Sequence, residues 1–201
     1  RSTNGGLSAA YIISGLGDAG TNANFIAPFI LDPNNPNTML AGGASLWRST
    51  NVKAGSPTWQ AIRAPGSDLI SAIAVAQGNS AIIWVAHNNG EVYYTTSGTS
   101  GSPTWITVDN NSSPNPLPNR YVTRIVIDPD VSQTVYVALG GFSPDNLWKT
   151  SDSGGTWSDL TGSGTTGLPS APIRGLARHP QRRNWLYVGT EVGIFASLNG
   201  G

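Results

Sequence analysis

The chain has 201 residues, of which only 11% are charged, and its formal net charge is zero. A chain of this length can bury a sizeable core as one domain. Because it lacks a basic field that would neutralise phosphates, we exclude nucleic acid and anionic membrane surfaces as partners. It contains no cysteine, which excludes disulfides and thiolate metal sites.

The composition is typical of a turn-rich all-β protein. It includes 25 glycines and 14 prolines, and Lys53 and Lys149 are its two lysines. No apolar run approaches the roughly 18 residues of a membrane span, and the first residues lack the pattern of a secretory signal. Compositions of this kind are found in proteins that bacteria export, so we expect a secreted or cell-surface location.

A polar hairpin motif recurs at Ser2, Ser49, Thr95, Thr150 and Ser197, at intervals of 47, 46, 55 and 47 residues. The first copy, residues 2–9, is followed by a candidate strand at 8–14 (SAAYIIS). Each later copy is preceded by three short apolar runs and, in all but the last repeat, is followed by a run that begins with Trp. Four strands in a repeat of 40–50 residues are typical of a β-propeller blade.

The predicted strands follow one another in the same order in each repeat. In chain order, the first three strands are 25–32, 38–43 and 45–49 in the first repeat; 70–76, 81–87 and 91–95 in the second; 122–128, 134–140 and 146–150 in the third; and 173–179, 184–190 and 193–197 in the fourth. Weak alternation in the early strands indicates that both faces are covered. Because no segment shows a 3.6-residue period, helical solenoids are excluded, and a two-sheet sandwich is the remaining alternative.

We therefore predict an all-β fold, a β-propeller of four four-stranded blades in a single unit, 1–201. The blades span about 24–63, 68–109, 120–160 and 171–201, the last completed by 8–14. Third strands place Trp47, Tyr93, Trp148 and Phe195 in one column. Aromatic residues at blade period favour packing between blades over a ring of sugar-stacking platforms.

The best copy of the hairpin is TSDSGGTW at 150–157. Asp152 can accept hydrogen bonds from the backbone of its own turn, while glycine supplies a positive φ. The structural set is Thr150, Asp152, Gly154, Thr156 and Trp157. We interpret Asp152 as a turn staple rather than a catalytic acid.

This hairpin resembles the Asp box of BNR-repeat propellers. Together with the turns DPNNPNTMLAGG (32–43) and DPDVSQTVYVALG (128–140), the chain resembles xyloglucanase-type glycoside hydrolases and related exported bacterial propellers most closely. Sialidases, sortilin-type receptors and photosystem II assembly factors are similar at the level of the box. The resemblance implies glycoside hydrolysis, sugar binding or protein docking, and fold-level analogy does not select among them.

Function is expected on the face formed by the loops from strand 2 to strand 3 and from each blade to the next, because loops on a rigid scaffold usually carry it. Its carboxylates are Asp18, Asp68, Asp109, Asp145, Glu91 and Glu191. Asp18, Asp68 and Asp145 are the candidates for catalysis, with solvated loop carboxylates as the alternative interpretation. Phe142, Asp145, Arg63 and Arg120 are the candidates for binding, whereas we interpret Trp84 as a core residue.

Other chemistries have little support in the sequence. A sialidase needs an arginine triad with a Tyr/Glu pair, and although Arg63, Arg120, Arg124 and Arg174 lie near strand ends, no Glu is placed to partner a Tyr. His87 and His179 are the two histidines, too few for a metal site or a Ser-His-Asp triad. We expect no metal and no cofactor.

Two arrangements could complete the blades. In a single ring, 8–14 would supply the fourth strand of the last blade and remove its open edge. Alternatively, two chains would pair as a homodimer that forms a larger ring. The leading functional hypothesis is a non-catalytic module that binds carbohydrate or protein, from a larger exported protein. The alternatives are a xyloglucanase-like glycoside hydrolase or part of one, and a purely architectural segment.

Overall fold

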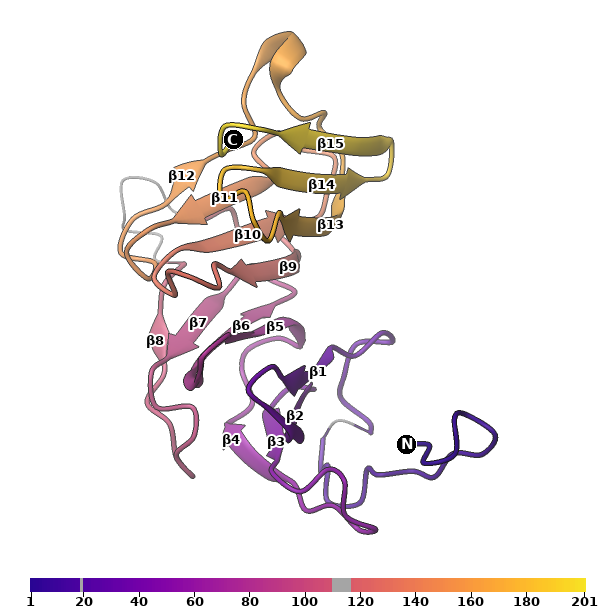
Figure 1. The fold of residues 1–201 in the computed structure, drawn as a ribbon. Helices are drawn as coiled ribbons and strands as arrows, with labels where there is room; N and C mark the ends of the chain where they lie inside the picture. Colours follow the sequence, from indigo (N-terminus) through magenta and orange to yellow (C-terminus); the bar gives the residue numbers. More distant parts are fainter. Residues whose placement is uncertain (19, 110–116) are drawn as a thin grey trace.

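The computed structural model describes residues 1–18, 20–109 and 117–201, and it consists of four antiparallel sheets that follow one another in sequence (Figure 1). The first sheet contains β1 (Phe29–Asp32), β2 (Asn35–Gly42), β3 (Leu46–Ser49) and β4 (Gln60–Arg63). The second contains β5 (Ile70–Ala76), β6 (Asn79–His87), β7 (Val92–Thr95) and β8 (Ile106–Thr107).

The third sheet contains β9 (Val122–Ile127), β10 (Val135–Leu139), β11 (Leu147–Thr150) and β12 (Ser158–Asp159). A 3₁₀ turn, η1 (Gly164–Thr166), precedes the fourth sheet, which contains β13 (Ile173–Arg178), β14 (Leu186–Thr190) and β15 (Gly193–Ser197). Within each sheet, sequential strands are neighbours. The all-β class and the propeller-like blade architecture are therefore confirmed.

The fourth sheet differs from the prediction because it has three strands. Residues 8–14 form no strand with it and lie beside the first sheet, at the opposite end of the series (Figure 1). The indole of Trp59 donates a hydrogen bond of 2.7 Å to the carbonyl of Ile12, and Arg1 donates one of 2.7 Å to the carbonyl of Val52. These contacts hold the N-terminal residues where they lie, so the structure does not show the predicted completion of the last blade by 8–14.

The core lies between successive sheets. Trp84 of β6 is fully buried, stacks on Tyr94 with ring centroids 5.0 Å apart, and meets Trp157 edge to face at 6.3 Å. This cluster joins the second and third sheets through Val137 and other aliphatic residues. Trp84 is a core residue, as predicted from its place in an apolar strand.

Third-strand residues show how each sheet is covered by the next. Leu46, Val92 and Leu147 occupy equivalent positions in β3, β7 and β11, and all three are buried. Ile194 is the equivalent residue of β15 and is 83% exposed, because no sheet among the described residues covers that face. The outer face of the fourth sheet is thus an uncovered blade face.

The hairpins that follow the third strands lie beside the turns between first and second strands. Ser153 donates its backbone N–H to the carbonyl of Gln133 at 3.0 Å. In the same hairpin Thr150 donates its hydroxyl to Asp152 at 2.7 Å, and the amide of Thr156 donates to Asp152 at 2.9 Å. Backbone and hydroxyl hydrogen bonds hold the pKa of Asp152 below its ordinary value. Asp152 therefore stabilises its own turn, as the sequence predicts.

Gly154 shows why this hairpin needs glycine. Its φ is +88°, and a Cβ there would lie 2.5 Å from Cβ of Val108, a buried residue of the preceding blade. The hairpin therefore packs its backbone directly against the neighbouring sheet, and both conformation and space exclude a larger side chain.

Candidate functional site

The predicted catalytic carboxylates Asp18 and Asp68 accept hydrogen bonds from nearby residues. Asp18 accepts hydrogen bonds from the amide of Ser45, at 2.8 Å, and from the indole of Trp47. Asp68 accepts from the amide of Leu69 at 2.7 Å. No hydrogen bond or ion pair among the described residues joins these carboxylates to one another or to Asp145.

Arg120 and Asp145 lie together on the loop face. The guanidinium of Arg120 meets the Asp145 carboxylate at 3.1 Å and also donates to the carbonyls of Pro144 and Asp145. Asp145 has a positive φ of 58°, and its carbonyl also accepts the indole N–H of Trp148 at 2.8 Å. This network fixes the loop 140–146. Phe142 projects from the same loop with 73% of its surface exposed.

A second group of polar residues lies at the loop face, where β4 and β6 end, β7 begins and the chain leaves β8. We call Arg63, His87, Glu91, Tyr93 and Asp109 the polar cluster. Arg63 Nη1 lies 3.1 Å from His87 Nε2, and the guanidinium carbon of Arg63 lies 3.9 Å from the Tyr93 ring centroid. The cluster thereby links the first sheet to the second.

His87 is fully buried, and its hydrogen bonds define its tautomer. Nδ1 lies 2.7 Å from the carbonyl of Asp68, so this nitrogen carries the proton and donates, which leaves Nε2 to accept from Arg63. Burial lowers the pKa of His87, the Asp68 carbonyl opposes this, and the nearby Arg63 charge lowers the pKa further. His87 is therefore a neutral link between the sheets.

The two carboxylates of the polar cluster have opposite pKa shifts. Burial raises the pKa of Asp109, whose Oδ1 has no hydrogen-bond partner among the described residues. For Glu91 burial also acts upward, but hydrogen bonds from Ser67, at 2.8 Å, and from Asn89 outweigh it and lower the pKa. A protonatable acid beside an ionised carboxylate is an arrangement that general acid catalysis uses.

The polar cluster and the Arg120–Asp145 network are adjacent, because the backbone segments that carry them are in tight contact. A Cβ on Gly90, in the turn between β6 and β7, would lie 2.6 Å from the backbone nitrogen of Arg120. The turn that carries Glu91 therefore packs against the segment that positions Arg120. The candidate site is this stretch of the loop face. Residues 19 and 110–116, which belong to the predicted connections before the first and third blades, lie outside the described residues.

The sequence predicts Arg63, Arg120, Asp145 and Phe142 on this face, but it does not predict the polar cluster. Two histidines are too few for a triad, and Asp109 and Glu91 are predicted only as loop carboxylates. The signal that could have located the cluster is position, since Arg63, His87 and Asp109 each lie at or just after the end of a strand in neighbouring blades.

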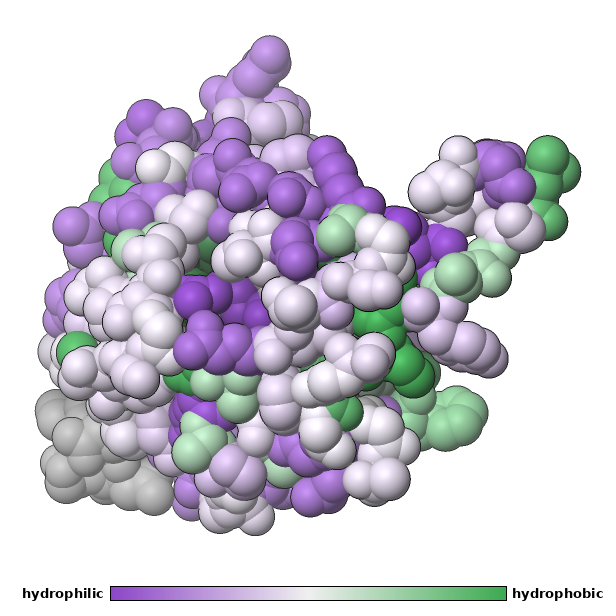
Figure 2. Space-filling model, turned by 90° about the horizontal axis from the view of Figure 1, so that it is seen from below, coloured by the Kyte–Doolittle hydropathy of each residue, from purple (hydrophilic) through white to green (hydrophobic). Residues whose placement is uncertain are grey.

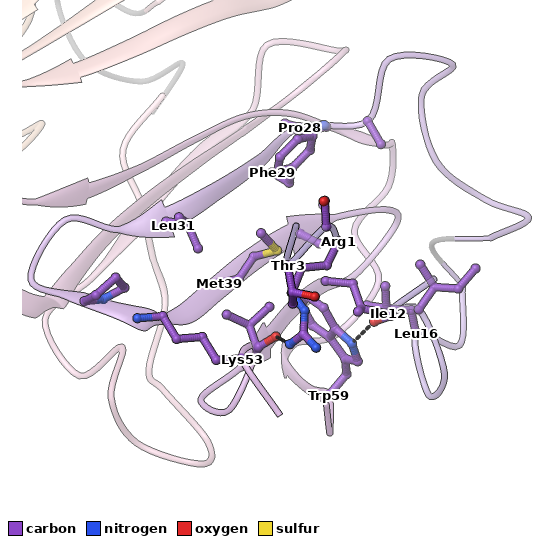
Figure 3. Close-up of a pocket in the computed structure, with 17 residues that line it drawn as sticks. Arg1, Thr3, Ile12, Leu16, Pro28, Phe29, Leu31, Met39, Lys53 and Trp59 are labelled. Atoms are coloured by element: carbon purple, nitrogen blue, oxygen red, sulfur yellow. Dashed lines mark hydrogen bonds between the residues drawn. The ribbon is translucent and has the colours of Figure 1, made fainter. Parts of the chain in front are cut away.

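A large hollow lies elsewhere, between the N-terminal residues and the outer face of the first sheet (Figure 3). This groove has a volume of about 880 Å³ and is lined by Ile12, Leu16, Phe29, Leu31, Met39 and Trp59, among others. Figure 2, viewed from the side of this sheet, shows hydrophobic residues gathered on part of the surface. The groove contains none of the predicted site residues.

The sheets and their order define the chain as an array of β-propeller blades. Its solved structural neighbours are also propellers: an ancestral GH74 enzyme (24% identity, TM-score 0.59), the GH74 enzyme of Niastella koreensis (20%, 0.59) and YCF48 from Cyanidioschyzon merolae (17%, 0.61). The matches cover 84%, 82% and 94% of this chain, and 23%, 26% and 55% of those chains.

The predicted resemblance to xyloglucanase-type propellers is therefore confirmed at the level of the fold. At these identities the similarity establishes the architecture, and the chain spans about a quarter of the length of the two GH74 enzymes. No protein-family profile and no curated protein matches the sequence. Among the described residues, no helix is long and apolar enough to cross a membrane, and no group of His, Asp or Glu side chains could hold a metal ion.

A pH dependence of stability follows from the buried, neutral His87. Its pKa is lowered on folding, so the unfolded chain binds the proton more tightly, and stability falls as the pH drops below the unfolded value of about 6.5. Between pH 7.5 and 5.5 we expect a loss of at most about 1.4 kcal/mol per pH unit. Chemical denaturation at the two pH values measures it.

His87→Gln is the control for this measurement, because its amide can donate and accept but does not titrate in this range. We expect the variant to be less stable at both pH values and to depend less on pH. An equal dependence in both proteins would contradict the assignment of this proton to His87.

Proposed function

We propose that the chain is a non-catalytic propeller module that binds carbohydrate through its loop face, around Phe142, Arg120 and Asp145. The observation that carries the proposal is an exposed aromatic ring on a loop whose backbone is held by the Arg120–Asp145 network. An apolar ring that stacks on a sugar, beside fixed donors and acceptors for its hydroxyls, is a common design of a binding site.

The proposal is also supported by what Asp18, Asp68 and Asp145 do. These carboxylates accept hydrogen bonds from Ser45, Leu69 and Arg120, which gives each of them a role in holding the structure. The propeller neighbours include a GH74 xyloglucanase from Xanthomonas campestris, which makes xyloglucan the first ligand to test. Export from a bacterial cell is part of the same proposal and rests on composition.

Binding to a panel of plant and bacterial polysaccharides, followed by titration calorimetry, tests the proposal. Phe142→Ala should weaken binding at least about tenfold, or about 1.4 kcal/mol, because an exposed aromatic anchor is lost. Phe25→Ala is the control, since Phe25 is also an exposed aromatic residue but precedes β1 of the first sheet. The proposal is overturned if no polysaccharide binds, or if both variants bind the polysaccharide as tightly as the wild-type chain does.

The opposite pKa shifts of Asp109 and Glu91 favour a second candidate function, a glycoside hydrolase. Glycosidases use one carboxylic acid to protonate the leaving oxygen and one carboxylate as nucleophile or base. Asp109, with its raised pKa, would be the acid. Activity on β-glucans that disappears in Asp109→Asn would establish this function, and inactivity across a broad panel would exclude it. Failure of both tests would leave the architectural role.

A further inference from the structure

Residues 8–14 occupy the position of a fourth strand that belongs to a blade preceding the first sheet. In the interior of the array, the hairpin Trp of one blade donates its indole N–H to the fourth-strand region of the blade before it: Trp105 to the carbonyl of Ile62, at 3.0 Å, and Trp157 to that of Val108, at 2.7 Å. Trp59 donates to the carbonyl of Ile12 at 2.7 Å in the same way (Figure 3). Ile12 is thus equivalent to Ile62 and Val108.

The hairpin that precedes this strand repeats the one that follows β15. Ser2 donates its hydroxyl to Asn4 at 2.9 Å and accepts the amide of Gly6 at 2.8 Å. Ser197 and Asn199 make the same hydroxyl contact, at 2.8 Å, and the amide of Gly201 donates to Ser197 at 2.8 Å. Residues 2–6 and 197–201 therefore hold the same place in the blade repeat.

The uncovered faces at the two ends of the array are equivalent to faces that cover each other inside it. Phe29 of the first sheet is 67% exposed, whereas Ile73 and Ile125, at the same register in β5 and β9, are each 8% exposed beneath the preceding sheet. Ile194 of the fourth sheet is 83% exposed, whereas its equivalents are buried beneath the following sheet. Each end face has the apolar residues that an interior junction buries.

We propose that two copies of this chain associate head to tail, with β13–β15 of one copy adding to residues 8–14 of the other and covering its first sheet. The added strand satisfies the backbone groups at the free edge of β15. Ile194 and Tyr187 of one copy then pack on Phe29 and Leu31 of the other, as Leu46 and Leu40 pack against the second sheet within the chain.

The register of this contact follows from the other blades. Gln60 and Ile106 lie two residues before Ile62 and Val108, whose carbonyls accept the tryptophan indoles. They pair with Arg48 and Tyr94, which are the residues directly before each hairpin. By the same count, Ala10 pairs with Ala196 of the other copy. In the structure Arg1, the residue before the first hairpin, exchanges backbone hydrogen bonds of 2.6 and 2.9 Å with Ala10. Arg1 and residues 2–6 therefore occupy the place that Ala196 and residues 197–201 of the other copy take, so the proposed association displaces the N-terminal hairpin.

Cysteine pairing tests the proposal cleanly because the natural chain has no cysteine. Ala10→Cys and Ala196→Cys are purified separately and mixed under mild oxidation. A hydrogen-bonded antiparallel pair has Cα atoms about 5.5 Å apart, within the range that a disulfide spans. We expect a disulfide-linked species of twice the chain mass. Ala9→Cys mixed with Ala196→Cys is the register control, since neighbouring strand residues point to opposite faces.

Sedimentation of the wild-type chain over a concentration series gives the association independently of any cysteine. Ile194→Asp should weaken it at least about tenfold, because a carboxylate would enter an apolar junction. Val131→Asp, at an exposed residue of the turn between β9 and β10 in the interior of the array, is the control and should leave association unchanged. Both side chains are exposed in the single chain, so neither change threatens folding.

Two results would overturn the proposal. One is a wild-type chain that stays monomeric at every concentration, with no linked species in the mixture. The other is a bridge between residues 10 and 196 within one chain in the double variant, which would show closure of a single ring instead. Because these readouts do not involve the loop face, their failure is separate from failure of carbohydrate binding.

Discussion

Trp84→Ala should lower the free energy of unfolding by about 3–5 kcal/mol, the largest effect that we expect from a single core substitution. Trp84 is fully buried and contacts Tyr94 and Trp157, so its removal leaves a cavity where the second and third sheets meet. Urea denaturation followed by far-UV circular dichroism measures the change.

Trp84→Phe separates packing from polarity at this site. The indole nitrogen of Trp84 has no hydrogen-bond partner among the described residues, so Phe loses volume but no hydrogen bond. We expect a cost of about 1–2 kcal/mol. A loss below about 1 kcal/mol for Trp84→Ala would contradict the placement of this ring at the centre of the junction between the sheets.

Asp128→Asn should cost about 2–4 kcal/mol because it leaves a buried guanidinium without its main counter-charge. Arg178 Nε lies 3.2 Å from Asp128 Oδ2, and the two side chains are 3% and 9% exposed. The pair joins the turn after β9 to the end of β13, that is, the third sheet to the fourth. Asn keeps the Oδ1 acceptor for the amides of Asp130 and Val131, so the change acts on the Oδ2 contact with Arg178, where both the charge and the acceptor are lost.

The control for this substitution is Glu191→Gln, which removes a carboxylate from an ion pair on the surface. Arg174 and Glu191 lie 2.6 Å apart, but their side chains are 59% and 38% exposed. Water screens such a pair, and its loss should cost at most about 1 kcal/mol. Thermal and chemical denaturation of the two variants, measured side by side, gives both losses of unfolding free energy. Equal losses would contradict the prediction that the buried ion pair contributes more than the exposed one.

Loop-face residues show how far a sequence pattern can locate a site. Strand ends can be read from apolar runs and turns, so Arg63, Arg120 and Asp145 were assigned to one face correctly. Which of them touch was not predictable, because contacts such as Arg63 to His87 join different blades and depend on how the sheets are stacked. The roles of Asp18 and Asp68 as local hydrogen-bond acceptors also required the tertiary structure.

The amino-acid sequence by itself determined the blades. Strand order, the aromatic column and the hairpin at 150–157 follow from local periodicity and turn chemistry, which act over a few residues and repeat along the chain. Only the tertiary structure decided where residues 8–14 lie, because a short strand can pair with any free edge and its partner depends on packing against the first sheet. The same long-range packing produced the polar cluster, the buried Arg178–Asp128 pair and the two uncovered end faces.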